Sequence, residues 1–283
     1  MKPIVKWAGG KTKLAPAINT AFSTPCAGVY FEPFLGSGAV YLHRRAAGQV
    51  PRSVLSDANG KLMAVHLAVR DELGAVFNAL DALPGDDWRE RYYDIREAYN
   101  EGPFVGASHA ARFLWLNRAC FNGLYRENRG GKYNVPVGSY VRLSLPSREH
   151  FQRVSELMQG TELVVSSFED VMSRASDGDQ VYCDPPYVPL SETACFTGYC
   201  KTPFGLAEQR LLAEVARQAA TRGAQVVLSN HDLPVVREEL YPEDDGFRHL
   251  AYPMVARAIS RNGAGRKRVG EVIASIGPNI EAA

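Results

Sequence analysis

The stretch Phe31-Glu32-Pro33-Phe34-Leu35-Gly36-Ser37-Gly38 decides the fold, because it ends an apolar run at 29–34 and opens a helical pattern at 38–47. Further runs of strand length follow at 53–56, 162–166, 181–183, 225–229 and 271–276. Helical patterns at 147–158 and 206–222 lie between some of them. This alternation predicts an α/β fold with a mostly parallel sheet that is covered by helices on both faces.

The glycines of this turn indicate a ligand. Without a side chain they let a bound molecule approach the backbone, although Gly36 and Gly38 lack the third glycine of the dinucleotide-binding pattern. Asp57 strengthens the signal, because it stands nineteen residues beyond Gly38 and after the next strand, where an acid can meet ribose hydroxyls. We therefore expect an adenosine-containing cofactor at the carboxyl edge of the sheet; a purely structural turn is the alternative.

The N-terminal segment Lys6-Trp7-Ala8-Gly9-Gly10-Lys11-Thr12 ends like a phosphate-binding P-loop. A P-loop needs glycine five positions before Gly10, but Val5 stands there and no apolar strand precedes it. A nucleotide triphosphatase is therefore not favoured. We interpret the segment as a mobile lid in which Trp7 offers an aromatic face and Lys11 a charge; an exposed turn is the alternative.

The strongest chemical signal is Asp184-Pro185-Pro186-Tyr187, directly after the strand at 181–183. Two prolines stiffen the backbone where the strand ends. The Asp184 carboxylate and the Pro185 carbonyl can then act as two acceptors for the two hydrogens of an exocyclic amino group. Tyr187 can stack on the attached ring. No catalytic histidine is needed, and His231 is interpreted as structural.

Composition is that of an ordinary globular protein with a formal net charge of +1, yet the charges are unevenly distributed. Residues 112–153 hold eight basic side chains against Glu127 and Glu149. A second basic cluster comprises Arg257, Arg261, Arg266, Lys267 and Arg268. Two such clusters suit a polyanion bound at one face, and solvated surface charge is the alternative.

Residues 61–146 interrupt the strand–helix alternation and indicate an insertion with its own role. The segment is helical at first, with Ser108 expected to cap a helix toward Cys120, and then rich in Gly, Asn and Arg over 122–140. The five cysteines form no CxxC pair, and we expect all of them to be reduced. With no signal peptide and no apolar run of membrane-spanning length, the sequence favours a cytoplasmic protein.

Several motifs together resemble the Dam family of DNA adenine-N6 methyltransferases. They are KWAGGK (6–11), FEPFLGSG (31–38), DANG (57–60), LNRACFNGLYREN (116–128), KYNVPVGSY (132–140), VYCDPPY (181–187), SNHD (229–232) and ISRNGAGRKRVGEV (259–272). The resemblance implies a Rossmann-like, S-adenosylmethionine-dependent methyltransferase sheet formed by residues 1–60 and 147–283. It further implies that residues 61–146 are an inserted, mostly helical target-recognition domain containing a hairpin.

The resemblance also assigns residues. The catalytic residues would be Asp184, Pro185 and Tyr187. S-adenosylmethionine would be held by Trp7, Lys11, Glu32, Phe34, Gly36, Gly38, Asp57, Phe168 and Asp184. Double-stranded DNA would be contacted by Lys6, Phe121, Asn122, Leu124, Arg126 and Tyr140. Phe121 falls where relatives insert an aromatic side chain into the base stack, and the target adenine must be flipped out of the duplex for its N6 to be reached.

Ser139 departs from the family, because relatives that recognise GATC carry arginine there, and tyrosine is usual where Phe121 stands. GATC is therefore the expected target, with the flanking preference left open, as is a restriction-modification role. The alternatives are methylation of RNA or of cytosine N4, and a DNA-binding regulator that has lost its chemistry. We expect a monomer that needs neither a metal ion nor a protein partner.

Overall fold

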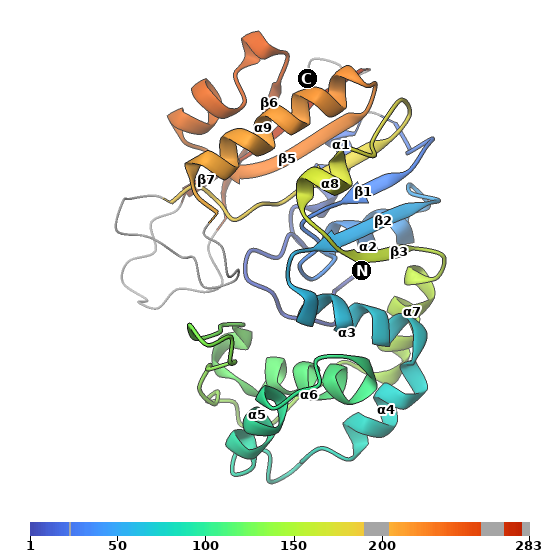
Figure 1. Ribbon diagram of the computed structural model, residues 1–283, viewed down its shortest axis with the longest axis vertical. Coiled ribbons are helices and arrows are strands. Elements are labelled where there is room, and N and C mark those ends of the chain that lie inside the picture. Colours follow the sequence, from blue (N-terminus) through green and yellow to red (C-terminus); the bar gives the residue numbers. More distant parts are fainter. Residues whose placement is uncertain (23, 190–203, 256–268, 279–283) are drawn as a thin grey trace.

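The computed structural model describes residues 1–22, 24–189, 204–255 and 269–278 (Figure 1). The strands are β1 (Tyr30–Glu32), β2 (Ser53–Asp57), β3 (Glu162–Val165), β4 (Gln180–Cys183), β5 (Gln225–His231), β6 (Arg248–Val255) and β7 (Val269–Ile276). The α-helices are α1 (Ala15–Ala21), α2 (Ala39–Ala46), α3 (Gly60–Asp71), α4 (Leu73–Asp81), α5 (Tyr92–Asn100), α6 (Gly106–Ala119), α7 (Arg148–Met158), α8 (Phe168–Met172) and α9 (Leu206–Thr221). The shorter helices are η1 (Phe121–Gly123), η2 (Val235–Leu240) and η3 (Glu243–Asp245).

The strands form one sheet in the order β3-β2-β1-β4-β5-β7-β6. The first five run parallel, whereas β7 pairs antiparallel with both β5 and β6. The strand order reverses between β1 and β4, and doubly wound sheets bind ligands outside such a switch point, at the carboxyl ends of the strands. The Rossmann-like α/β fold expected from the sequence is confirmed.

Alternate side chains of the strands enter two different cores, as the two-residue period of a strand requires. Tyr30, Leu55 and Tyr182 face one side, which α1, α2, α3 and α7 cover. Phe31, Val54 and Val181 face the other, which α8 and α9 cover. Both faces of the sheet are therefore buried, so only its edges and the loops at strand ends are open to ligands.

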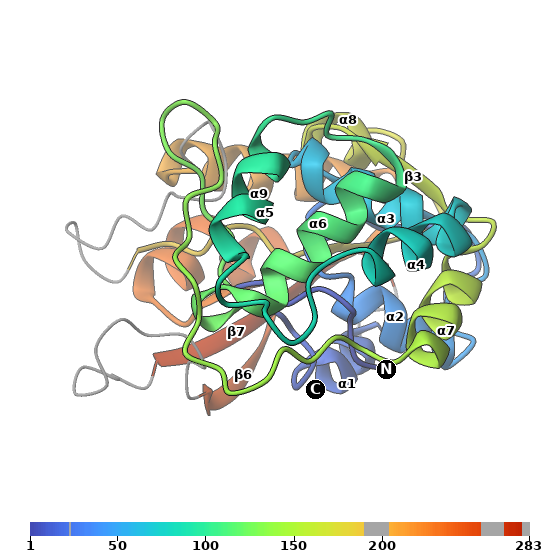
Figure 2. The same cartoon turned by 90° about the horizontal axis from the view of Figure 1, so that it is seen from below.

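Residues 58–161, between β2 and β3, add no strand to the sheet. Helices α4, α5 and α6 form a separate helical part of the molecule, and α3 packs against α6 on one side and against β2 and β3 on the other. After α6 the chain folds back through antiparallel bridges Cys120↔Val137 and Glu127↔Tyr133 and runs around this end of the molecule to α7 (Figure 2). This helical part with its hairpin-like return has the content expected of the insertion, while the domain boundaries stay a prediction.

The helix caps expected from the sequence are correct for α7 and wrong for α6. Ser147 does cap α7, because its hydroxyl accepts from the amide of His150 at 3.2 Å. Ser108 does not cap α6: the helix already begins at Gly106, with Val105 at the capping position. The expectation was wrong because Gly106, with φ +71°, starts the turn two residues earlier. Strand β6 was not anticipated.

Three cysteines, Cys26, Cys120 and Cys183, are buried free thiols. Cys195, Cys200 and the basic cluster at 257–268 lie outside the described residues. Among the helices of the described ranges, none is long and apolar enough to span a membrane.

Candidate active site and DNA-recognition face

The loops that follow β1, β2, β4 and β5 all leave the sheet at one edge because these strands are parallel. The loop after β1 contains the glycine turn, β2 ends in Asp57, and β4 is followed directly by Asp184. The switch point between β1 and β4 therefore brings the glycine turn beside Asp184, although the two are about 150 residues apart in sequence.

The glycine turn is built around Asp57. The amide of Gly36 donates to Asp57 Oδ2 at 2.9 Å, and the amide of Asn59 donates to Oδ1 at 2.9 Å. Burial raises the pKa of Asp57, and these two amide hydrogen bonds oppose that rise. Gly36 and Gly38 have φ of +48° and +72°, values that side chains disfavour.

Trp7 covers this turn. A Cβ atom on Gly36 would lie 2.8 Å from Trp7 Cδ1, so the indole packs directly against the glycine backbone. Trp7 also contacts Tyr125 of the helical part, with ring centroids 5.3 Å apart. The N-terminal segment thus joins the edge of the sheet to the helical part.

The other predicted cofactor residues lie on two sides of β1. Phe34 stacks on Phe168 with ring centroids 5.5 Å apart, and Phe204 packs edge-on against both. Glu32 is buried and accepts a hydrogen bond from Tyr30 Oη at 2.6 Å. Burial raises the pKa of Glu32 to about 8. Of the two stacked rings, Phe168 is buried and Phe34 is half-buried beside the glycine turn.

Lys11 contacts the Asp-Pro-Pro-Tyr loop rather than solvent. Its Nζ lies 2.9 Å from Asp184 Oδ1 and 4.6 Å from the centroid of the Tyr187 ring. It also donates to the carbonyl of Gly9 at 2.6 Å, and the side chain is buried. A cation therefore lies within hydrogen-bonding distance of the carboxylate that was predicted to accept the hydrogens of an amino group.

A network of side chains from distant elements fixes the Asp-Pro-Pro-Tyr loop. Gln209 of α9 donates to the Pro186 carbonyl at 2.6 Å and accepts from Asn230 at 3.0 Å. Asn230 accepts from the amide of Val188 at 3.1 Å, and His231 Nδ1 lies 2.6 Å from the Val188 carbonyl. Such a network holds the loop rigid without any covalent link.

Tyr187 is oriented in the same way. Its hydroxyl donates to Glu271 of β7 at 3.0 Å, and its ring meets His231 edge-on at 4.8 Å. Gln209 and Glu271 were missed in the sequence. Gln209 could have been found from its position: it stands three and seven residues before Leu212 and Ala216, so this polar side chain lies on the apolar stripe of α9.

Burial dominates the electrostatics of this loop. It raises the pKa of Asp184, and the charge of Glu271 adds to the rise, whereas the nearby charge of Lys11 lowers the pKa. The pKa of Tyr187 lies well above its ordinary value, because of burial and of the Asp184 and Glu271 charges. The phenol therefore stays neutral near neutral pH, and Lys11, more than the Tyr187 hydroxyl, favours the ionised form of Asp184.

The predicted DNA-contacting residues gather where the N-terminal segment meets the chain after α6. Lys6 Nζ lies 4.8 Å from the centroid of the Tyr140 ring, and Gly123 packs against the Lys6 side chain. Phe121 is 41% exposed, a high value for a large apolar side chain, and its neighbour Asn122 has φ +54°. We call these residues the recognition face; its members are Lys6, Phe121, Asn122, Leu124, Arg126 and Tyr140.

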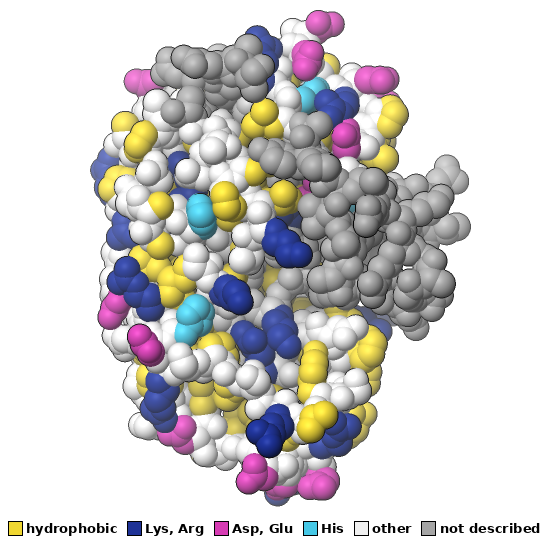
Figure 3. All heavy atoms as spheres, turned by 180° about the vertical axis from the view of Figure 1, so that it is seen from behind, with side chains coloured by type: hydrophobic (Ala, Val, Ile, Leu, Met, Phe, Trp, Pro, Cys, Tyr) yellow, Lys and Arg dark blue, Asp and Glu magenta, His cyan; other side chains and the backbone are white. Residues whose placement is uncertain are grey.

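Arg126 is exposed but held in place. Its Nε donates to Asn134 Oδ1 at 2.7 Å, and its Nη2 donates to the Asn134 carbonyl at 3.1 Å. Lys and Arg side chains gather across the middle of the molecular face in Figure 3, and most acidic side chains on that face lie toward its margins. A face whose basic side chains lie toward its middle and whose acidic side chains lie toward its margins suits a polyanionic ligand.

Comparison with known proteins agrees with this geometry. Residues 7–250 match the family model described as D12 class N6 adenine-specific DNA methyltransferase. The chain is 37% identical to the DNA adenine methylase of Escherichia coli K12 and 36% identical to that of Salmonella typhi, in both cases over 99% of this chain and 96% of the relative. It is 36% identical to the DNA adenine methylase of Vibrio cholerae serotype O1 (strain N16961), over 99% of this chain and 97% of the relative.

Proposed function

Since this chain belongs to the D12 class of N6 adenine-specific DNA methyltransferases, we propose that it methylates N6 of an adenine flipped out of duplex DNA, within GATC, using S-adenosylmethionine. The observation that carries the proposal is the position of Asp184-Pro185-Pro186-Tyr187, directly after β4 and across the switch point from the glycine turn. The assignments of individual residues below belong to the proposal.

The residues at the sheet edge fit an adenosine-containing methyl donor. The turn at Gly36 and Gly38, which Trp7 covers, lies at the carboxyl end of β1, and Asp57 supplies a carboxylate at the end of β2. Phe34, half-buried on Phe168, supplies an aromatic face. The rest of the proposed set comprises Trp7, Lys11, Glu32 and Asp184. When bound, S-adenosylmethionine supplies a methyl group on a positively charged sulfur, which is an excellent leaving group.

The chain's own contribution is to orient a poor nucleophile. The lone pair of an adenine amino group is delocalised into the ring. Acceptance of both amino hydrogens by the Asp184 carboxylate and the Pro185 carbonyl would favour a pyramidal nitrogen whose lone pair points at the methyl group. Tyr187, held by Glu271, would stack on the base. Lys11, now beside Asp184, would make room for the amino group while keeping the carboxylate ionised.

Flipping the adenine costs a few kcal/mol of lost stacking and pairing. The exposed ring of Phe121 can fill the space that the base leaves, and basic side chains can bind the phosphates. Lys6, Asn122, Leu124, Arg126 and Tyr140 would contact bases or backbone of the site. Ser139 is exposed and precedes Tyr140 in the chain. Because this position lies on the surface, we expect the serine to cost a contact to a phosphate or to a flanking base pair that an arginine would make.

The proposal includes a monomer acting on double-stranded DNA in the cytoplasm; the buried free thiols of the described residues support the compartment, and the names of the relatives support the DNA substrate. It is tested by expressing the protein in a methylation-deficient host and sequencing the DNA with a method sensitive to N6-methyladenine. Methylation confined to GATC is the expected result. The mark at another motif would overturn the GATC assignment and keep the chemistry, while soluble protein that leaves no mark would overturn both.

A further inference from the structure

Asn117, near the end of α6, joins the N-terminal segment to the recognition face from beneath. Its side chain is 3% exposed. Oδ1 accepts from the amide of Lys6 at 2.7 Å, and Nδ2 donates to the carbonyl of Lys6 at 2.8 Å. Nδ2 also donates to the carbonyl of Gly123 at 3.2 Å. One buried amide therefore binds two backbone segments that are far apart in sequence.

The two segments are packed as closely as glycine allows. Gly123 has φ +65°, and a Cβ atom there would lie 2.5 Å from Cδ of Lys6. The residues on either side of Gly123, Asn122 and Leu124, belong to the recognition face, as does Lys6. A shift of either backbone would consequently move the side chains of this face relative to one another.

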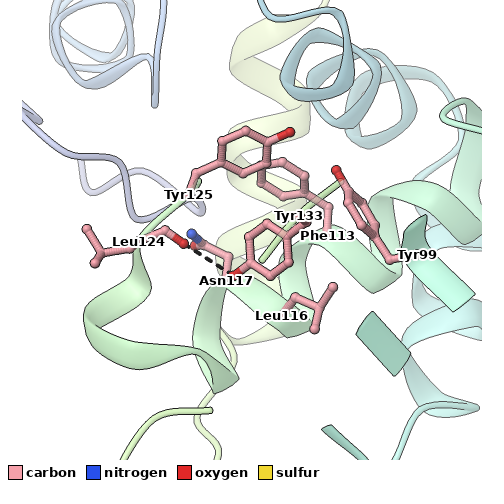
Figure 4. A pocket seen from close by; sticks show the side chains of 7 residues that line it. All are labelled: Tyr99, Phe113, Leu116, Asn117, Leu124, Tyr125 and Tyr133. Atoms are coloured by element: carbon pink, nitrogen blue, oxygen red, sulfur yellow. Dashed lines mark hydrogen bonds between the residues drawn. The ribbon is translucent and has the colours of Figure 1, made fainter. Parts of the chain in front are cut away.

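The surroundings of Asn117 are tightly packed. It borders a cavity of about 10 Å³, lined also by Leu116, Leu124 and four aromatic rings (Figure 4). Tyr133, one of these rings, donates from its hydroxyl to the carbonyl of Leu124 at 3.3 Å. A space of this size admits at most one water molecule, so the underside of the recognition face has little freedom to rearrange.

We propose that Asn117 is a specificity-determining positioning residue, which fixes Lys6 relative to Gly123 and its neighbours and so sets how strictly the target sequence is read. It acts through these residues and is too deeply buried to touch DNA itself. The proposal rests on the proposed function, because it needs an enzyme that methylates one sequence in preference to others.

The test replaces Asn117 by leucine, which has a similar volume but can neither accept from Lys6 nor donate to the two carbonyls. Initial rates are measured on the target duplex and on a panel of duplexes with every single base-pair substitution in the site. We expect the preference for the target to fall about tenfold or more at the base pair that Lys6 reads. Asn117→Ser, which stays neutral and whose hydroxyl can make at most one of the three hydrogen bonds, should also relax the preference and carries the test if Asn117→Leu does not fold.

Tyr41→Phe is the matched control for stability. Tyr41 lies on α2 against the sheet, is fully buried, and its hydroxyl donates to the carbonyl of Leu157 at 2.6 Å, outside the helical part. Both variants should lower the melting temperature, but only the Asn117 variant should relax discrimination. Equal relaxation in the two variants at equal loss of stability would overturn the proposal.

A double-mutant cycle with Lys6→Ala identifies the route. If Asn117 acts through Lys6, then Asn117→Leu should cause no further relaxation at that base pair in the Lys6→Ala background, whereas full additivity would refute the route. Methylation by the unmodified enzyme tests the proposed function separately. Sequence-specific wild-type activity combined with unchanged discrimination in Asn117→Leu would defeat only the role of Asn117.

Discussion

The carboxyl edge of the sheet and the recognition face are proposed to bind different parts of the substrates, and buried hydrogen bonds support both. At the sheet edge the side chains that would carry chemistry, Asp184 and Tyr187, are largely enclosed, and a network from α9, β5 and β7 holds their loop. On the recognition face three of the six side chains are exposed, Phe121 among them, three are half-buried, and Asn117 supports them from underneath.

The difference follows from what each region must bind. An amino group can be oriented strongly only where water is excluded and acceptors are fixed in advance, because both conditions strengthen electrostatic interactions. A DNA groove must be met by side chains that protrude, so their precision depends on the backbone that carries them. The N-terminal segment serves both regions, through Lys6 on one and through Trp7 and Lys11 on the other.

Replacing Asp184 by alanine should separate the two regions most strongly. Loss of the acceptor should lower kcat by about 10³-fold, because the amino group would no longer be oriented, while DNA binding stays within a few-fold of wild type. Single-turnover methylation and fluorescence anisotropy with labelled duplex measure the two effects. Substantial residual turnover would contradict the proposed chemistry, and lost DNA binding would mean that the regions are not separable.

Gly36→Ala should damage only the cofactor side of the sheet edge. The new methyl group would meet Trp7, at a φ of +48° that costs energy in itself, so affinity for S-adenosylmethionine should fall roughly a hundredfold, about 3 kcal/mol. Titration calorimetry with the cofactor measures it. Gly48→Ala is the matched control, because Gly48 has φ +70° and open space around it, and it should leave the affinity unchanged.

Arg126→Ala should damage only the recognition face. We expect discrimination at one base pair of the site to weaken by about 1–3 kcal/mol, with kcat on the target duplex little changed. Rates on the panel of substituted duplexes provide the measurement, and Arg129→Ala, an exposed arginine three residues away, provides the control. Unchanged specificity in Arg126→Ala would show that Arg126 does not contribute to recognition of the target sequence.

Lys11→Met should shift a pH profile, the smallest of these effects. Burial raises the pKa of Asp184 and the Lys11 charge lowers it, so removing that charge should raise the pKa further. Activity needs the ionised carboxylate and falls as the pH drops through this pKa. The acid limb of kcat/KM should therefore move to higher pH in Lys11→Met and stay in place in the exposed control Lys13→Met. A limb that moves to lower pH would contradict the ion pair's role.

Much of the fold was predictable because its signals are local. Each parallel strand was found from a short apolar run, and α7 and α9 from periodicity and end residues, since these depend on neighbours in sequence. Strand β6 and the true start of α6 were not found. The edge strand β6 carries His249 and Pro253 among its apolar residues, and Gly106 begins a helix without the hydroxyl cap that Ser108 offered two residues later.

The sequence by itself determined which local pieces this protein has: the glycine turn with Asp57, the Asp-Pro-Pro-Tyr loop after a strand, and an irregular segment rich in Asn and Arg after a helix. Only the tertiary structure decided that Lys11 meets Asp184, that Glu271 holds Tyr187 from 84 residues away, and that Asn117 binds Lys6 across 111 residues. Turns and helix caps depend on residues that are adjacent in sequence. The three contacts depend on the strand order and on the packing of the helical part, which bring together residues that are far apart in the chain.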